Sequence, residues 1–313
     1  MKKFAFTLPF KSNFFKEQDP FHLVIVFFII FFGTAIFFSI PTFYDFKKYS
    51  EKIENTINSE YKFKLHNLEN ISFRFIPSPH LLIKKADLKI NANEDTVVSN
   101  LKNIKVFISI TDFYKKDIFA IKRIEVKKGN FYLNANSFKN IIQNLKKNIV
   151  NNLIIEKSTI FFKNKKKEIV LISTIRNLNY KIDFLNSKKI LKINGNIFDA
   201  NYQFTYLIDY NFPNIQNTVL ELRDPNITLE NKLEEINFNK NNSNGDLIIR
   251  FLNKKNILQY KIKDNFINFN NKNLKNPIFD LNGSVNFKPF HFDLLLDLKK
   301  IKLKELENIL YNI

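Results

Sequence analysis

Hydrophobic and polar residues alternate along most of the chain, and the alternation has the two-residue period of a β-strand. Two segments show it most clearly, and their alternating large apolar residues are Tyr202, Phe204, Tyr206, Ile208 and Tyr210 in the first and Phe290, Phe292, Leu294, Leu296 and Leu298 in the second. Polar residues such as Gln203, Asp209 and Asp293 occupy positions between them. Since successive side chains of a strand point to opposite faces of a sheet, both segments are predicted to be half-buried strands.

Similar alternation recurs in shorter segments after Tyr61, including residues 104–110, 178–184 and 258–262. Stretches rich in Asn, Lys and Gly separate the strands, and residues 127–130 and 241–245 are interpreted as turns. We expect about fifteen to twenty short strands, more than one ordinary sandwich holds. The predicted fold is therefore mainly β, with an N-terminal transmembrane helix, a long, curved, mostly antiparallel and groove-like sheet, and a few short helices.

A continuous apolar run near the N-terminus breaks this pattern. Residues 21–40 contain no Asp, Glu, Lys or Arg, and about 20 residues of α-helix match the hydrocarbon thickness of a bilayer. A cleavable signal peptide has a shorter apolar run that ends in small residues, whereas this run ends in Phe37, Phe38 and Ile40. An uncleaved transmembrane anchor is therefore favoured over a signal peptide or a buried core helix.

The chain divides around this anchor. Lysines at positions 2, 3, 11 and 16 precede it and lysines at 47, 48 and 52 follow it, so the charge bias only slightly favours a cytoplasmic N-terminus. No second apolar run of comparable length follows, so all later residues are predicted to lie on one side of the membrane. The predicted parts are a cytoplasmic tail (1–20), the anchor (21–41), an amphipathic linker helix (42–60) and a repetitive β domain (61–313).

Three helices are predicted besides the anchor. In the linker, the residues that recur at spacings of three and four are Phe43, Phe46, Tyr49, Ile53 and Ile57. They form one apolar stripe, which is expected to cap the first part of the sheet rather than lie on the membrane. Ser137 is expected to cap a helix over residues 137–150, and apolar spacing predicts a terminal helix over residues 302–313.

Composition and charge narrow the possible functions. With 45% hydrophobic residues, 36 of the 313 residues being Phe, the chain is too apolar to be disordered. Its net charge of +19 would ordinarily suggest nucleic acid. However, Arg occurs only five times while Lys, Asn, Ile and Phe abound, a pattern typical of a genome that favours A and T codons. Nucleic-acid readers favour Arg, so no nucleic-acid partner is predicted.

No cluster of residues with catalytic or metal-binding chemistry is recognisable. The four histidines, at positions 22, 66, 80 and 291, have no ligand-type neighbour at metal-binding spacing, and there is no cysteine. Phosphate loops, nucleophile elbows and zinc-protease motifs are missing from the sequence. Glu234 and Glu235 are adjacent and would face opposite ways on a strand. We therefore predict no enzyme activity, no cofactor and no metal.

One stretch is more specific. In residues 71–93 a strand ends at Phe75 and Ile76, the segment Pro77-Ser78-Pro79 forces an extended corner, and a new strand follows through Leu82, Ala86, Leu88 and Ile90 with Asp87 between apolar residues. Coming after an anchor and a short helix, this motif resembles the start of the AsmA-like family of envelope proteins. Residues 118–133 and 279–310, the latter with Gly283 and the Lys288-Pro289-Phe290 corner, resemble the family more weakly.

The resemblance implies a β-groove anchored in the inner membrane by one span, with its bulk in the periplasm. It relates the chain to bridge-like proteins that move phospholipids or support outer-membrane assembly, with membrane lipids and other envelope proteins as partners. A sheet with one continuous apolar face can shield acyl chains from water, at roughly 0.8 kcal/mol per methylene. A sheet of this size is expected to need a partner, self-association or a membrane-proximal role to act across an envelope.

Two functions stay open at this point. In the first, the alternating residues of 202–210 and 290–298 line a lipid-binding groove. In the second, the chain is a structural scaffold for envelope assembly, and the same residues form a closed core, which is the commoner fate of such residues. An anchored hydrolase is a third, disfavoured reading.

Overall fold

The structure, a computed structural model, describes residues 20–61, 63–89, 98–109, 111–112, 114, 120–137, 140–141, 152–223, 226–237, 242–251, 254–271, 279–287 and 290–298. Its helices are α1 (Pro20–Ser39), η1 (Ile40–Phe43), η2 (Phe46–Tyr49) and α2 (Ser50–Tyr61). Its strands are β1 (Lys64–Arg74), β2 (His80–Lys89), β3 (Ser99–Ile108), β4 (Ile121–Leu133), β5 (Asn152–Lys163), β6 (Ile169–Asp183), β7 (Lys188–Ile197), β8 (Ala200–Asp209), β9 (Phe212–Leu222), β10 (Ile227–Asn237), β11 (Asn242–Phe251), β12 (Lys254–Lys263), β13 (Phe266–Asn271), β14 (Phe279–Phe287) and β15 (Phe290–Leu298).

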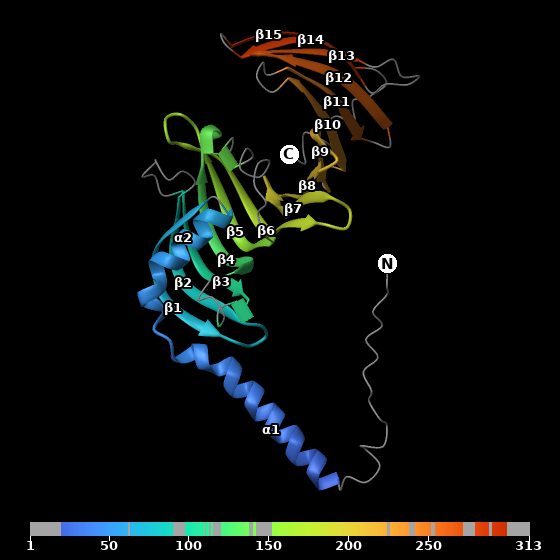
Figure 1. The fold of residues 1–313 in the computed structure, drawn as a ribbon. Coiled ribbons are helices and arrows are strands. Elements are labelled where there is room, and N and C mark those ends of the chain that lie inside the picture. Colours follow the sequence, from blue (N-terminus) through green and yellow to red (C-terminus); the bar gives the residue numbers. More distant parts are fainter. Residues whose placement is uncertain are drawn as a thin grey trace.

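All fifteen strands belong to one sheet, in which each strand pairs with the strands next to it in sequence. Figure 1 shows the sheet curving from β1, beside the helices, to β15 at the far end. Every pair is antiparallel except β4 and β5, which are parallel. The sheet is open, with β1 and β15 at its edges. This confirms the predicted fold class, and the strand number lies within the predicted range.

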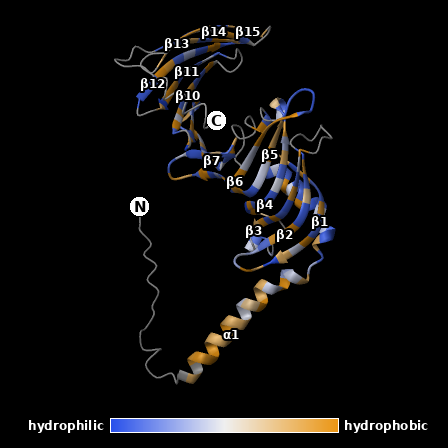
Figure 2. Ribbon diagram, turned by 180° about the vertical axis from the view of Figure 1, so that it is seen from behind, coloured by the Kyte–Doolittle hydropathy of each residue, from blue (hydrophilic) through white to orange (hydrophobic). Residues whose placement is uncertain are grey.

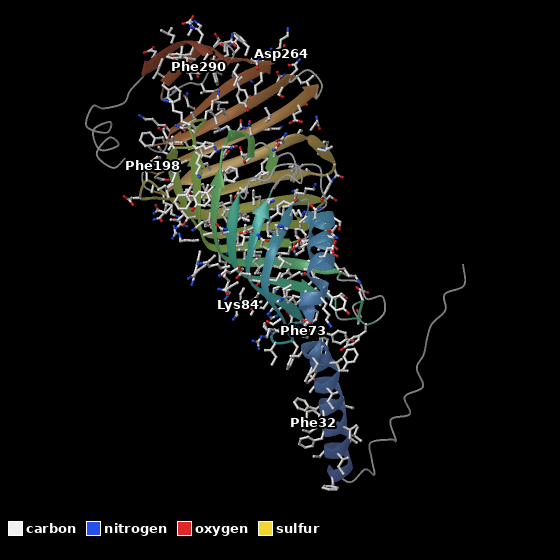
Figure 3. All side chains as sticks on the ribbon, turned by 90° about the vertical axis from the view of Figure 1, so that its left-hand side faces the viewer. Phe32, Phe73, Lys84, Phe198, Asp264 and Phe290 are labelled. Atoms are coloured by element: carbon white, nitrogen blue, oxygen red, sulfur yellow. The ribbon has the colours of Figure 1, made fainter. Side chains whose placement is uncertain are left out.

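The predicted anchor forms α1, which is mostly hydrophobic in Figure 2. Within the described residues, Leu23–Phe43 is the one helical segment long and apolar enough to cross a membrane, and its most apolar 18-residue stretch is not buried in the protein. Phe32, for example, projects away from the rest of the chain in Figure 3. The end of this segment contacts the connection between β3 and β4, because the Tyr114 hydroxyl donates to the Phe37 carbonyl at 2.7 Å. A single-pass anchor is consistent with this arrangement.

The linker stripe packs on the sheet as predicted, with one exception. Phe46, Ile53, Ile57 and Tyr61 are all buried in the main core. Phe43 is 88% exposed, because the chain is extended at Tyr44 and the Asp45 side chain accepts from the Lys47 N–H, so that a new helical turn begins after Phe43. The linker is thus two short 3₁₀ turns followed by α2, rather than one helix over 42–60.

The remaining predicted helices fall largely on residues outside the described ones. Residues 135–137, 140 and 141 are helical, and the Ser137 N–H donates to Asn134 Oδ1 at 2.8 Å. Asn134, rather than Ser137, is therefore the capping residue, because its side chain accepts a hydrogen bond from the backbone N–H of the residue three positions later. The rest of 137–150 and the terminal helix at 302–313 lie outside the described residues.

The predicted turn at 127–130 is wrong, since these residues lie inside β4. They belong to a set of adjacent residue pairs that point away from the core, with one pair on each strand from β2 to β6. We call this set of pairs the seam. Its members are Lys84–Lys85, Lys102–Asn103, Lys127–Lys128, Glu156–Lys157 and Arg176–Asn177. Each pair interrupts the two-residue alternation once, so that the residue before the pair and the residue after it point to the same core. On β2, for example, Ile83 and Ala86 flank the pair and are both buried. Asn103 and Lys157 adopt positive φ here, as at β-bulges.

The predicted turn at 241–245 is also wrong for its described part, because residues 242–245 belong to β11. Gly245 lies opposite Tyr260 of β12. The Tyr260 ring covers the glycine, and its hydroxyl donates to Asn231 Oδ1 of β10 at 2.6 Å. A glycine in a strand can thus mark the close approach of a ring rather than a turn. Gly129 is comparable, since a Cβ there would be 2.8 Å from Leu101 Cδ2.

Candidate functional site

One face of the sheet carries a row of apolar residues that crosses from β1 to β11 without interruption. Residues directly opposite each other on paired strands point to the same face, so the pairing register traces the row. It consists of Ile71, Ile83, Ile104, Val126, Ile155, Leu178, Ile193, Phe204, Leu220, Leu229 and Ile249. We call the side of the sheet on which this row lies the apolar face.

The other side of the sheet carries a polar row. Its corresponding row from β6 to β12 consists of Asn177, Asn194, Gln203, Glu221, Thr228, Arg250 and Lys255. Across the row, Arg250 Nη1 lies 2.8 Å from Glu230 Oε1 in a part-buried ion pair. A sheet with one apolar and one polar side can hold an apolar ligand or a second layer on the first while the second faces water.

Burial of the apolar face falls from one end of the sheet to the other. At the N-terminal end, α2 packs on it, and Ile83 and Ile104 are fully buried. From β6 to β11 the row is half-buried, as at Phe204 and Ile249. At β15, Phe292 is 59% exposed. The first strands therefore have a sealed core, whereas the later strands present apolar side chains to their surroundings.

The predicted lining residues come together on this one face. Tyr206 and Ile208 are each 5% exposed, and Tyr202 and Phe204 are half-buried. Tyr210 lies in the turn after β8 and is 38% exposed. On β15, Phe290, Phe292, Leu294 and Leu296 are 40–70% exposed, and the Leu298 side chain lies outside the described ones. The closed-core alternative thus fits Tyr206 and Ile208, while the β15 set is open.

The residues of the family-like motif lie in the first hairpin of the sheet, in the β1–β2 connection and on β2. Phe75 and Ile76 lie in the β1–β2 connection and are exposed. Pro77 follows a cis peptide bond, and residues 76–78 form bends before β2. The Ser78 carbonyl lies 2.7 Å from His80 Nδ1.

Asp87 joins three strands on the polar side. Its carboxylate accepts from Asn67 Nδ2 of β1 at 2.9 Å and from Asn100 Nδ2 of β3 at 2.6 Å. Asn67 has a φ of +53° at an irregular step of the β1–β2 pairing. A carboxylate that bridges neighbouring strands at such a step stabilises the first hairpin, so its position in the motif has a folding reason.

Tyr180 of β6 and Tyr202 and Tyr206 of β8 lie on the apolar face, and we call them the tyrosine band. The Tyr206 hydroxyl donates to Gln216 Oε1 at 3.0 Å, and Gln216 Nε2 donates to Glu235 Oε1 at 2.5 Å. The Tyr180 hydroxyl is buried and has no hydrogen-bond partner among the described residues. Lys189, 5% exposed on the same face, has its pKa lowered by burial.

The buried tyrosines predict sensitivity to alkaline pH. Burial raises the pKa of Tyr180 and of Tyr206 well above their ordinary value. A raised folded-state pKa contributes stability that is present below the unfolded value, about 10, and is lost as the pH rises above it. We expect the free energy of unfolding to fall above pH 10, measured by urea denaturation at each pH. Tyr180→Phe should reduce this fall without a loss at neutral pH, because no hydrogen bond is removed; an unchanged alkaline fall would contradict this assignment.

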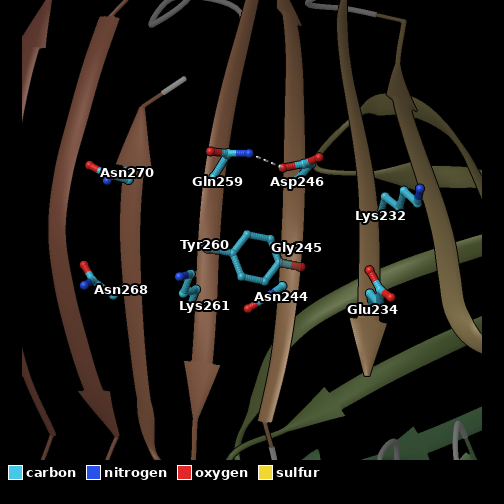
Figure 4. A pocket seen from close by; sticks show the side chains of 10 residues that line it. All are labelled: Lys232, Glu234, Asn244, Gly245, Asp246, Gln259, Tyr260, Lys261, Asn268 and Asn270. Atoms are coloured by element: carbon cyan, nitrogen blue, oxygen red, sulfur yellow. Dashed lines mark hydrogen bonds between the residues drawn. The ribbon is translucent and has the colours of Figure 1, made fainter. Parts of the chain in front are cut away.

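A hollow of about 450 Å³ lies on β10 to β13 and is drawn in Figure 4. Its lining is mostly polar: Lys232, Glu234, Asn244, Gly245, Asp246, Gln259, Tyr260, Lys261, Asn268 and Asn270. Gln259 donates to Asp246 across it at 3.3 Å. Opposite charges share the lining and neutralise each other, so the hollow has no strong preference for an anion or a cation.

A second hollow, also about 450 Å³, is apolar and was missed by the sequence analysis. It lies where β6 begins, against the β7–β8 turn, and Val170, Ile172 and Phe198 in it are 52–67% exposed. The signal was present in the uninterrupted run Ile169-Val170-Leu171-Ile172, because a strand without alternation places apolar side chains on both faces.

The titratable groups form no arrangement for metal binding in the described part of the chain, where no group of three His, Asp or Glu side chains could hold an ion. Glu234 and Glu235 are neighbours on β10 and so point to opposite sides of the sheet. Glu235 accepts from Gln216, while Glu234 lines the polar hollow.

Neither the models of known protein families nor the curated proteins give a match to this sequence.

Proposed function

We propose that this chain is a non-enzymatic, single-pass protein of the inner membrane that binds phospholipid acyl chains along the apolar face and passes them between membranes. The observation that carries the proposal is the unbroken apolar row from β1 to β11 beside a helix that can anchor the chain. The family-like corner at Pro77-Ser78-Pro79 adds support for an AsmA-like protein of the envelope, with its bulk in the periplasm and a role in outer-membrane assembly.

The burial gradient restricts where lipid would lie. The apolar row is at most 8% exposed on β2 to β5, so the contacts are assigned to β6 to β15, where most of the apolar side chains are half-buried or exposed. Each methylene shielded there is worth about 0.8 kcal/mol, so contact with ten methylenes would supply on the order of 8 kcal/mol before the losses of ordering the lipid.

A photocrosslinking experiment in cells tests the proposal. A photoreactive amino acid at Phe204 or Phe292 is expected to give lipid adducts, identified by mass spectrometry. Matched probes at Gln203 and His291 sit one residue away on the polar side and should give none. Equal adducts on both sides, or none on the apolar side, would remove the lipid-binding proposal.

A substitution on the apolar face tests how much that face contributes to the affinity for phospholipid. Leu294→Asp, at an exposed position of the apolar face, should force about two methylenes of a bound chain into water, a loss of roughly 1.6 kcal/mol, which is about tenfold in affinity. The amount of phospholipid that copurifies with the full chain measures this. The matched change Asp293→Asn on the polar side should leave it unchanged.

A scaffold without lipid cargo is the second candidate function, favoured by the sealed N-terminal part of the sheet. It predicts protein adducts from the probe at Phe292 and no acyl-chain adducts from any position. The same photocrosslinking experiment therefore separates the two.

A further inference from the structure

The outer edge of the sheet, at β15, carries many exposed apolar side chains. Phe290 is 70% exposed and Leu295 71%, and every side chain from Phe290 to Asp297 is exposed. In the described part of the chain, β15 pairs with β14 and no strand lies on its other side. Such an edge presents a row of backbone N–H and C=O groups to another strand, and proteins usually protect it with a short, charged or bulged strand.

We propose that β15 pairs antiparallel with β15 of a second copy of this chain, with Leu294 opposite Leu294. Opposite residues of an antiparallel pair point to the same face. In this register Phe292 lies opposite Leu296 of the second copy, so the two apolar faces meet on one side of a joined sheet.

The charges on the other side of β15 select this register. With Leu294 at the centre, all nine residues of the strand are paired, His291 lies opposite Asp297 of the second copy, and Asp293 lies opposite Leu295. With Asp293 at the centre, two aspartates face each other. With Leu295 at the centre, Asp293 faces Asp297 twice. Like charges directly opposite each other are destabilising, so the Leu294 register is preferred over both neighbours.

The joined sheet would have an anchor at each outer end. Fifteen strands at about 4.8 Å extend roughly 70 Å, and two copies extend roughly 140 Å. The inference rests on the edge of the sheet alone. Where the proposed lipid binding also holds, the two apolar faces join into one continuous surface that both copies share.

The full chain in its membrane allows a clean crosslinking test, because it contains no cysteine. Leu294→Cys is expected to form a disulfide-linked dimer under mild oxidation, since opposite residues about 4.5–5.5 Å apart suit a disulfide. Asp293→Cys and Leu295→Cys report the two neighbouring registers and should crosslink weakly. Leu185→Cys, 98% exposed in the β6–β7 turn, measures random collision.

Each outcome of the crosslinking experiment either supports or overturns the proposed pairing. Crosslinking at Leu294 above the Leu185 level, identified by mass spectrometry as two copies of the chain, supports the pairing. Stronger crosslinking at Asp293 or Leu295 overturns the register. Crosslinking at the Leu185 level, or adducts to a different protein, overturns the second copy as occupant. As a second measurement, mass photometry of the full chain should show dimers, and Leu294→Lys should give monomers with an unchanged circular dichroism spectrum. Lipid adducts at Phe204 are scored separately, so failure of either proposal leaves the other readable.

Discussion

Replacing Ile104 with alanine is expected to lower the stability of the N-terminal part of the sheet by about 2–5 kcal/mol. The side chain lies fully buried on β3, between Ile83 of β2 and Val126 of β4. Both neighbours are held in place by backbone pairing, and all three side chains belong to the same buried cluster as Ile53 and Ile57 of α2. The site therefore cannot collapse around the smaller residue, and the loss includes a cavity as well as the transferred methyl groups.

Hydrogen exchange followed peptide by peptide is the suitable measurement. Contacts between strands are concentrated on neighbouring pairs, so the sheet resembles a one-dimensional array, and its ends can open separately. We expect faster exchange in peptides from β2 to β5 of Ile104→Ala, with β10 to β15 unchanged. A uniform increase throughout the sheet would mean that it unfolds as one unit.

The matched control lies on the same face at the other end. Leu296→Ala removes a side chain that is 55% exposed, and substitutions at such positions usually change stability by about 0.5 kcal/mol or less. If the two variants lost similar stability, the apolar face of β15 would be covered in solution, and the gradient from a sealed to an open face would be incorrect.

The alternation in the sequence was sufficient to predict the strands but not their faces. Period-two patterns at Tyr202 to Tyr210 and at Phe290 to Leu298 identify β8 and β15 correctly. Whether these two sets of apolar residues lie on the same side of the sheet depends on the register of the seven strand pairs between β8 and β15. No local sequence pattern determines that register. Burial depends in addition on long-range packing, because Ile104 belongs to one buried cluster with Ile53 and Ile57 of α2, whereas Phe292 is 59% exposed.

The turn signals failed for a physical reason. Adjacent lysines followed by glycine usually indicate a loop, yet Lys127 and Lys128 are the outward pair of the seam, and Gly129 makes room for Leu101. The same ambiguity applies at Gly245, where the partner ring is fifteen residues away on β12. Long-range packing, rather than local backbone preference, decided both positions.

Alanine substitutions at the glycines are expected to fall into three levels. At Gly195 and Gly283 a Cβ would overlap a backbone carbonyl oxygen, that of Thr174 and that of Asp293, and Gly283 also has a φ of +137°. We expect losses of about 3 kcal/mol or more at both, at the upper end of overpacking and backbone strain. At Gly245 the obstacle is the Tyr260 ring, which can rotate away, so about 1–3 kcal/mol is expected. At Gly33, with nothing within 4 Å, no loss is expected.

Thermal unfolding by circular dichroism ranks these variants, and the order identifies what each glycine does. Gly195 lies between β6 and Tyr202 of β8. The loss of stability in Gly195→Ala should therefore be accompanied by exposure of the tyrosine band, so that its tyrosines titrate more readily at alkaline pH. Gly283 lies opposite Leu294, so Gly283→Ala should detach the edge strand and reduce the Leu294→Cys crosslink in the double variant. An effect at Gly195 as small as that at Gly33 would show that strands β6 and β7 can separate to admit a side chain, and the close approach there would not contribute to stability.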